Sequence, residues 1–370
     1  MSQWNPAAPL YDNLDQRNIQ VWGTTQQPRM LLGGCYQWQF PNAMPWTAQP
    51  PNAAPIAAVV PALPAPNLPA AAALTNMDLH RFMNIIATVP PAGNRILLVG
   101  PITVPNGLRS DLLGDASAPV FNSIVNPIIA NALAGQLPAN IVPEDQQAVA
   151  PGQYLCFLQD VTNAQHILVY GPTLKQNSVL TRQVTRANTG TATGALTPAT
   201  KLTRQKDFRP DTRARDMICR VTGVPVPLRA RGANFSAFEA AHVWGHGMVK
   251  DVIYITSFEP GPVQAVLRQL VQSDADKPRN GLLMLAHMHV FFDDYQLSFS
   301  RPAPNSLVPR GYKFERGGAT GFTPGLPMFA SQGDPAIAAT APEFLDFHFK
   351  TALLWHVGGT GRPRPARIQP

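Results

Sequence analysis

Apolar and polar residues alternate along the chain in two ways, one typical of helices and one typical of strands. Leu79, Phe82, Met83 and Ile86 have the i, i+3, i+4, i+7 spacing of one helix face, so a helix is predicted to begin at Asn76. Short apolar runs bounded by turn residues predict strands instead. In the first half of the chain these strands are expected at residues 95–100, 154–158 and 166–170, with two more around a polar turn within residues 18–34.

The second half shows the same two patterns in closer succession. The apolar residues between Val263 and Leu270 repeat at helical spacing and predict a packing helix. Thr340 and Glu343 form a capping box, which predicts a helix over residues 342–356. A further helix is expected at residues 286–295, and strands are expected at residues 217–221, 240–244, 281–285 and 296–300.

Changes in composition divide the chain into an N-terminal and a C-terminal part. From residue 41 to residue 77 there are nine prolines, many alanines and no charged residue, so this stretch is expected to be an extended or disordered insertion. The small polar residues 187–200 are typical of a linker. We therefore predict an α+β protein with a strand-rich domain over residues 1–200, a second domain over residues 206–356 and a basic tail at residues 357–370.

Positive charge is concentrated just before the second domain's polar motifs. The chain carries a formal net charge of +7 at pH 7, and residues 201–231 contain nine basic and three acidic side chains, a net charge of +6. This stretch is either a solvated surface or a surface that binds phosphate groups in a salt-dependent manner. In the second case the phosphate-binding residues are Arg204, Arg209, Arg213 and Arg215.

Other features of the composition exclude several classes of protein. No stretch of about eighteen uninterrupted apolar residues is present, so no membrane span is predicted. The N-terminus lacks a basic start followed by an apolar run, so we find no signal peptide and expect an intracellular protein, nuclear or cytoplasmic. Cys35, Cys156 and Cys219 are widely spaced and odd in number, which argues against a disulfide framework and a thiolate zinc site. They are expected to be reduced and buried.

Four polar residues of the second half have the spacing of a metal-dependent hydrolytic site. Asn280 precedes His289 by nine residues, and Asp293 follows His289 by four. Because four residues make about one helical turn, His289 and Asp293 are expected to point from one helix face toward one cation. His242 lies upstream, and an imidazole suits the removal of a proton from water near neutral pH.

Each of these residues also has an ordinary structural explanation. His242 would fit a hydrogen-bonded histidine of the core beside a tryptophan. Asn280 stands before a glycine, as in many turns. His289 and Asp293 would form a stabilising pair on a helix surface.

Taken together, the motifs resemble those of the HNH endonuclease family, the ββα-metal nucleases, and most closely its fungal members. The resemblance rests on Cys219-x-x-Thr222-Gly223, Ala240-Ala241-His242, Asn280-Gly281-Leu282-Leu283 and His289-Val290-Phe291-Phe292-Asp293, with a weaker likeness in Glu343–Phe349 and Gly358–Gly361. It implies two strands and a helix that hold one divalent metal, in a domain with helical insertions.

The resemblance also implies a role for each residue of the motifs. His242 would be the general base, and Asn280 would hold this histidine or the loop above it. His289 and Asp293 would bind the divalent metal. An imidazole and a carboxylate accept Mg²⁺, Mn²⁺ or Zn²⁺, so the ligands do not identify the metal.

Two positions depart from the family pattern. Many members carry a metal-binding Asp or His directly before the catalytic His, where this chain has Ala241. His287 stands where close relatives generally have Asp. An additional metal ligand is therefore expected from His246, His287 or Glu239, unless the site has lost it.

Three functions are compatible with these observations. The first is a metal-dependent endonuclease acting on nucleic acid, with DNA favoured over RNA. The second is a catalytically decayed module of the same fold that binds nucleic acid or protein. The third is a protein–protein scaffold that uses the proline-rich insertion. The basic stretch 201–231 favours the first two, and Ala241 separates them.

Overall fold

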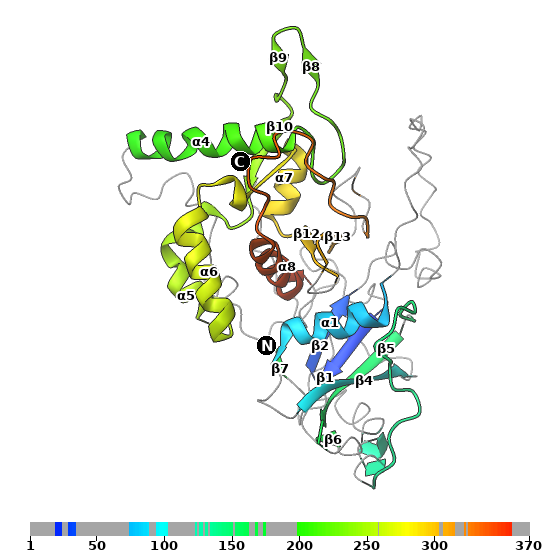
Figure 1. Ribbon diagram of the computed structural model, residues 1–370. Helices are drawn as coiled ribbons and strands as arrows, with labels where there is room; N and C mark the ends of the chain where they lie inside the picture. Colours follow the sequence, from blue (N-terminus) through cyan, green and yellow to red (C-terminus); the bar gives the residue numbers. More distant parts are fainter. Residues whose placement is uncertain are drawn as a thin grey trace, which may run out of the picture.

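The structure is a computed structural model of the chain. It describes residues 19–23, 29–34, 74–88, 94–102, 134–150, 152–162, 167–168, 173–174, 198–257, 259–302, 306–314 and 325–356, with Phe322 and isolated positions between residues 123 and 131. Helices and small sheets are mixed in this part of the chain, which confirms the predicted α+β class (Figure 1). No helix among these residues is long and apolar enough to cross a membrane.

Short strands dominate the described residues of the first half. They are β1 (Ile19–Gly23), β2 (Arg29–Gly34), β3 (Ala87–Thr88), β4 (Asn94–Ile102), β5 (Gly152–Asp160), β6 (Ile167–Leu168) and β7 (Thr173–Leu174). A five-stranded sheet has the order β2-β1-β5-β4, with β6 paired to β5. β1 and β5 are parallel, whereas the other neighbours are antiparallel. β3 pairs separately with β7.

Helix α1 (Asn76–Ile86) packs against β4 and against the last helix, α8 (Pro342–His356). The hydroxyl of Thr75 accepts the N–H of Asp78, whose carboxylate accepts the N–H of Thr75, so a capping box starts the helix. The apolar stripe predicted for α1 is buried, and Phe349 of α8 joins the same core. One apolar core therefore connects the first and last parts of the described chain.

The second half contains a larger share of helix. Its elements are α4 (Pro198–Asp216), β8 (Leu228–Arg229), β9 (Gly232–Ala233), β10 (Phe238–His242), α5 (Val252–Thr256), α6 (Gly261–Asp274), β11 (Gly281–Leu285), α7 (Ala286–Asp293), β12 (Leu297–Ser300), β13 (Arg310–Lys313) and α8, with short 3-10 helices at His246–Asp251 and Pro278–Asn280. The antiparallel pairs are β8–β9, β10–β11 and β12–β13. β11 and α8 have the predicted bounds, and the strand expected at 240–244 begins two residues earlier as β10.

Residues 217–221, predicted as a strand, form a tight loop instead. The N–H of Gly223 donates to the carbonyl oxygen of Cys219 at 2.9 Å and closes the turn. Gly223 has a φ of +74°, and a Cβ at this position would lie 2.5 Å from Cε1 of Phe329. The strand prediction was wrong because the chain reverses at this turn: Ile218 forms an isolated bridge with Pro225 instead of a continuous strand, and the apolar side chains of the run pack against the core.

The buried face of α6 also differs from the prediction. Val263 and Val266 are 46% and 43% exposed, whereas Leu267, Leu270 and Val271 are buried. The buried residues of α6 therefore lie from its middle toward its C-terminus, and the valine positions of its N-terminal half are exposed. The reason is that α6 lies beside α5 at the outer edge of the molecule, so only one side of it meets the core (Figure 1).

Several predictions lie wholly or partly outside the described residues. Cys35, the tail 357–370 and nearly all of the insertion 41–77 are not described, and of the linker 187–200 only the last residues are, as the start of α4. Cys156 and Cys219 are buried thiols, as expected, and burial raises the pKa of the Cys156 thiol. The division into two domains stays a prediction.

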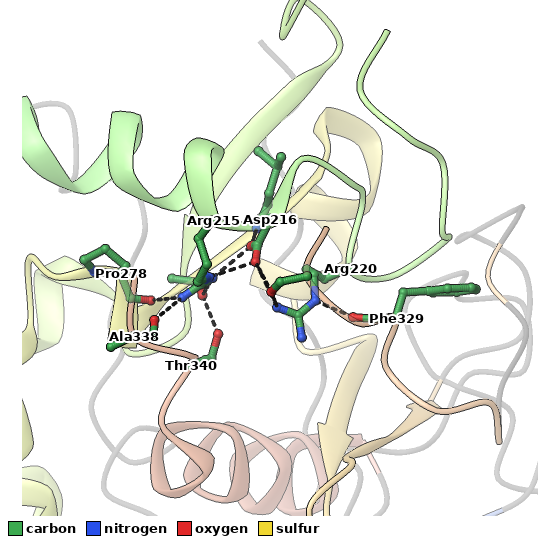
Figure 2. A network of polar contacts seen from close by, with 10 residues as sticks. Arg215, Asp216, Arg220, Pro278, Phe329, Ala338 and Thr340 are labelled. Atoms are coloured by element: carbon green, nitrogen blue, oxygen red, sulfur yellow. Dashed lines mark hydrogen bonds and ion pairs between the residues drawn. The ribbon is translucent and has the colours of Figure 1, made fainter. Parts of the chain in front are cut away.

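A buried ion-pair network attaches the end of α4 to the strands of the second half (Figure 2). The carboxylate of Asp216, which is fully buried, accepts hydrogen bonds from Arg215 at 2.8 Å and from Arg220 at 2.9 Å. It also accepts the backbone N–H of Leu283 in β11 at 2.8 Å. Asp216 is thus bonded to its own helix end, to the following loop and to a strand.

The same network extends to the segment before α8. The guanidinium of Arg215 donates to the carbonyl oxygens of Pro278, Gly281 and Ala338. Thr340, predicted as a capping residue, donates its hydroxyl to the carbonyl oxygen of Gly281 at 2.7 Å (Figure 2). Arg215 and Thr340 therefore hold the start of β11 from two sides.

Candidate active site

β10, β11 and α7 form a unit of two antiparallel strands followed by a helix. His242 at the end of β10 lies opposite Gly281, and Glu239 lies opposite Met284. α7 begins directly after β11 and packs against both strands. Because Glu239 contacts His289 of α7, the polar residues of the strand and of the helix lie in one region.

His242 is held at the end of β10 by an aromatic side chain of α4. Its imidazole is stacked on Phe208, with ring centroids 3.8 Å apart and planes inclined by 6°. Burial lowers the pKa of His242 to about 4, and the charges of His246 and His289 act in the same direction. The charge of Asp293 opposes this shift. At neutral pH His242 is therefore an uncharged imidazole in the electrostatic field of the α7 residues, and it is able to accept a proton.

Asp276 faces His242 from the turn after α6. Its Oδ1 lies 3.8 Å from Nε2 of His242 and 3.4 Å from Nε2 of His246. Neither Nε2 of His242 nor Oδ1 of Asp276 forms a hydrogen bond within the described part of the chain, although both atoms are buried. Unpartnered buried polar atoms are rare and are typical of places that receive water, an ion or a substrate. Asp276 belongs to no local sequence motif, so its place beside His242 was not predicted.

Asn280 holds the chain that follows His242. Its side chain is fully buried, and its Oδ1 accepts the N–H of Trp244 at 2.7 Å. Its Nδ2 donates to the carbonyl oxygens of Trp244 at 3.0 Å and Ala275 at 2.9 Å. Asn280 therefore fixes the loop next to His242 through the side-chain amide.

His289 is bracketed by two carboxylates. Its Nδ1 lies 2.5 Å from Oε2 of Glu239, and its Nε2 lies 3.3 Å from Oδ1 of Asp293. Burial disfavours the charged imidazolium, but the hydrogen bonds and charges of Asp293 and Glu239 outweigh it, so the pKa of His289 is raised. Protonation of His289 therefore competes with cation binding up to a higher pH than protonation of a free histidine would.

The donors around His289 fit one divalent cation with two protein ligands. Two ligand atoms that are each about 2.1 Å from one metal lie roughly 3.0–3.4 Å apart, and the 3.3 Å between His289 Nε2 and Asp293 Oδ1 agrees with this. Glu239 lies at the other ring nitrogen, where it suits the hydrogen bond that orients a metal-binding imidazole. Among the described residues, no group of three or more His, Cys, Asp or Glu side chains is arranged to hold a metal.

The structure does not bring the other expected ligands to this pair. Ala241 is fully buried in the core, so no donor approaches from its position. His246 faces Asp276, and His287 is exposed on a different side of α7 from His289. Of the three residues considered as an additional ligand, only Glu239 contacts His289.

The basic stretch contributes only part of the expected phosphate-binding surface. Arg209 is exposed on α4, and Arg213 is partly buried with its Cζ 4.8 Å from the centre of the Phe235 ring. Arg215 is buried within the ion-pair network, so its expected place on this surface is wrong. The reason is that Arg215 lies on the face of α4 that meets β11. The side chain of Arg204 lies outside the described part of the structure.

These features define a class of site: two antiparallel strands and a helix, with a neutral His on the first strand and a His–carboxylate pair on the helix. Residues 219–300 match the family model described as HNH endonuclease. The resemblance inferred from the sequence is confirmed for this segment, which includes His242, Asn280, His289 and Asp293. The narrower likeness to fungal members stays a prediction. No curated protein and no solved structure matches the chain.

Proposed function

We propose that this protein is a metal-dependent endonuclease that hydrolyses phosphodiester bonds in DNA. The observation that carries the proposal is that one β10–β11–α7 unit carries both the half-buried His242, at the end of β10, and the His289–Asp293 pair, on the helix that packs against β10. A base for water and a cation site are the two groups that hydrolysis of a phosphodiester requires. The match to the HNH endonucleases supports the same reaction.

His242 supplies the base in this mechanism. With a pKa of about 4 it is unprotonated at neutral pH and takes a proton from the attacking water. Stacking on Phe208 fixes the plane of the ring, and Asn280 fixes the chain after it. Asp276 faces Nε2, so its carboxylate would stabilise the imidazolium that forms when His242 takes up the proton.

His289 and Asp293 would hold the cation, and Glu239 would keep the proton on Nδ1 of His289 so that Nε2 faces Asp293. When bound, the divalent cation supplies Lewis-acid stabilisation of the scissile phosphate and of the leaving oxygen. Two protein ligands leave several positions for water and phosphate oxygens, as is common for Mg²⁺ sites.

A second candidate is a catalytically inactive module of the same fold that binds nucleic acid. The buried Ala241 favours this function, because the family's carboxylate or imidazole at that position is missing, and among the described residues no group of three His, Cys, Asp or Glu side chains replaces it. Asp293, His289 and the partly exposed Glu239 would then form only a surface cluster.

Nicking of supercoiled plasmid DNA distinguishes the two candidates. With Mg²⁺ or Mn²⁺ we expect conversion to nicked and linear forms, and a chelator should stop it. His289→Ala should lower the rate by about two orders of magnitude, since it removes a ligand of the cation. His287→Ala, an exposed His on the same helix, is the matched control and should remain active. DNA binding without nicking by either metal would support the inactive module.

Glu239→Gln is expected to weaken metal binding by about 10- to 100-fold, because loss of an orienting carboxylate has this effect on metal-binding histidines. Isothermal titration with Mn²⁺ measures the affinity directly, without reference to cleavage. Glu144→Gln is the control, since Glu144 is exposed and pairs with His80 in the other half of the chain. An unchanged Mn²⁺ affinity in Glu239→Gln would show that Glu239 does not orient His289.

A further inference from the structure

The hairpin of β8 and β9 projects from the body of the protein beyond α4 and β10 (Figure 1). Leu228 pairs with Ala233 and Arg229 pairs with Gly232, so Ala230 and Arg231 form the tip. Leu228 is 76% exposed, and every residue from Pro227 to Gly232 is exposed. The hairpin therefore contributes nothing to the core, and its side chains are free to meet a partner.

The root of the hairpin is well fixed, although its tip is exposed. Val226 is buried, and the N–H of Asn234 donates to the carbonyl oxygen of Pro227 at 2.8 Å. Phe235 lies against the guanidinium of Arg213, which also donates to the carbonyl oxygen at the start of β10. An isolated two-stranded hairpin is only marginally stable in water, so these root contacts are what hold it in place.

The charge of the hairpin indicates an anionic partner. Between Met217 and Phe238 there is no acidic residue, while Arg229 and Arg231 stand at the exposed tip. At the root, burial and the nearby charge of Arg209 lower the pKa of Arg213, and its Nε is buried without a hydrogen bond in the described part of the chain. Within the described part of the chain, Arg213, Arg229 and Arg231 form no ion pair with a carboxylate.

The β8–β9 hairpin directly precedes the strand of the candidate active site. The chain runs from the hairpin through Phe235 directly into β10, which carries Glu239 and His242. Only residues 234–237 separate the hairpin from this strand, so the arm is attached next to the unit that carries the candidate active site. From Val226 to Ala230 the chain advances by four residue steps and spans up to about 13 Å when extended, which exceeds the roughly 8.5 Å depth of the major groove of B-form DNA.

We propose that the β8–β9 hairpin is a DNA-binding arm that enters the major groove of a duplex next to the cleavage site. The major groove accepts a two-stranded ribbon, and arginine side chains there can contact phosphates or guanine edges. The corresponding groove of double-stranded RNA is too narrow for side chains, so the arm selects duplex DNA. This inference rests on the proposed function, because it takes the polyanion at the site to be the nuclease substrate.

Fluorescence anisotropy with a short labelled duplex, in a chelator that prevents cleavage, tests the arm in the full chain. Arg229→Gln/Arg231→Gln should lower the affinity for duplex DNA by at least about tenfold and reduce the salt slope by up to about two units. The effect on double-stranded RNA should be much smaller. The matched control, Arg95→Gln/Arg310→Gln on β4 and β13, removes the same charge elsewhere and should leave the affinity nearly unchanged.

A second measurement does not depend on affinity. A photo-crosslinking amino acid in place of Ala230 should form a covalent adduct with duplex DNA and not with double-stranded RNA. Equal affinity losses in the hairpin and control variants, or no crosslink from the tip, would overturn the proposal. If the wild type binds DNA through the hairpin but does not nick plasmid, the nuclease proposal fails and the arm stands. If the wild type nicks plasmid and the hairpin variant binds DNA as tightly as the wild type, the arm proposal fails and the nuclease proposal stands.

Discussion

Replacing His242 by alanine is expected to slow plasmid nicking by about 10²- to 10⁴-fold at saturating metal, the usual contribution of a general base. His242→Gln should have the same effect while it retains a polar side chain of similar size beside Phe208. DNA binding and Mn²⁺ affinity should stay close to those of the wild type, because His289 and Asp293, and not His242, are the proposed ligands of the cation. Single-turnover nicking separates this loss of rate from a loss of binding.

The pH dependence of the wild-type rate provides an independent check. Since the pKa of His242 is lowered to about 4, the base stays unprotonated above that pH, and the acid limb of the rate at saturating metal should lie near pH 4. At limiting metal the rate should already decrease at a higher pH as the solution is acidified, because the raised pKa of His289 lets protons compete with the cation. An acid limb close to the ordinary histidine pKa at saturating metal would contradict the assignment of His242 as the base.

Asp216→Ala is expected to lower the free energy of unfolding by about 3–5 kcal/mol. The variant leaves two buried guanidinium groups, those of Arg215 and Arg220, without their common carboxylate. It also removes the acceptor of the Leu283 N–H in β11, so the strand that leads into α7 should loosen. Urea unfolding monitored by tryptophan fluorescence measures the loss.

Asp207→Ala is the matched control, because Asp207 is an exposed carboxylate on the same helix, and it should change stability by less than about 0.5 kcal/mol. Burial alone would raise the pKa of Asp216, but the hydrogen bonds and charges of Arg215 and Arg220 outweigh it and lower the pKa. The stabilisation is therefore fully present above the unfolded-state pKa of about 3.9 and is lost as the pH falls through the lower folded-state pKa. A difference between wild type and Asp216→Ala that shrinks already above pH 5 would argue against the network.

Helix α4 buries a largely polar face that the sequence did not predict to be buried. Phe208, Thr212, Arg215 and Asp216 have the i, i+4, i+7, i+8 spacing of one helix face, and all four are buried. Arg215 was expected on a phosphate-binding surface because it belongs to the basic stretch 201–231, and a hydrophobicity pattern does not register a polar stripe on a helix face. A buried Arg is compatible with the core only when a carboxylate and several carbonyl oxygens meet it, and no local pattern predicts that meeting.

The sequence by itself determined the features that depend on neighbouring residues. The stripe and capping box of α1, the bounds of β11 and α8, the α+β class and the likeness of residues 219–300 to HNH endonucleases all follow from local spacing. Local spacing determines these because helix and strand periods, caps and short motifs involve residues only a few positions apart.

Only the tertiary structure decided which distant residues meet. It placed Asp276 before His242, Glu239 against His289, and the apolar run 217–221 in a loop rather than a strand. It also placed the basic residues 229 and 231 on a projecting hairpin and Arg215 in the interior. These outcomes depend on how helices and strands pack around one core, and the same local sequence is compatible with either burial or exposure until that packing is known.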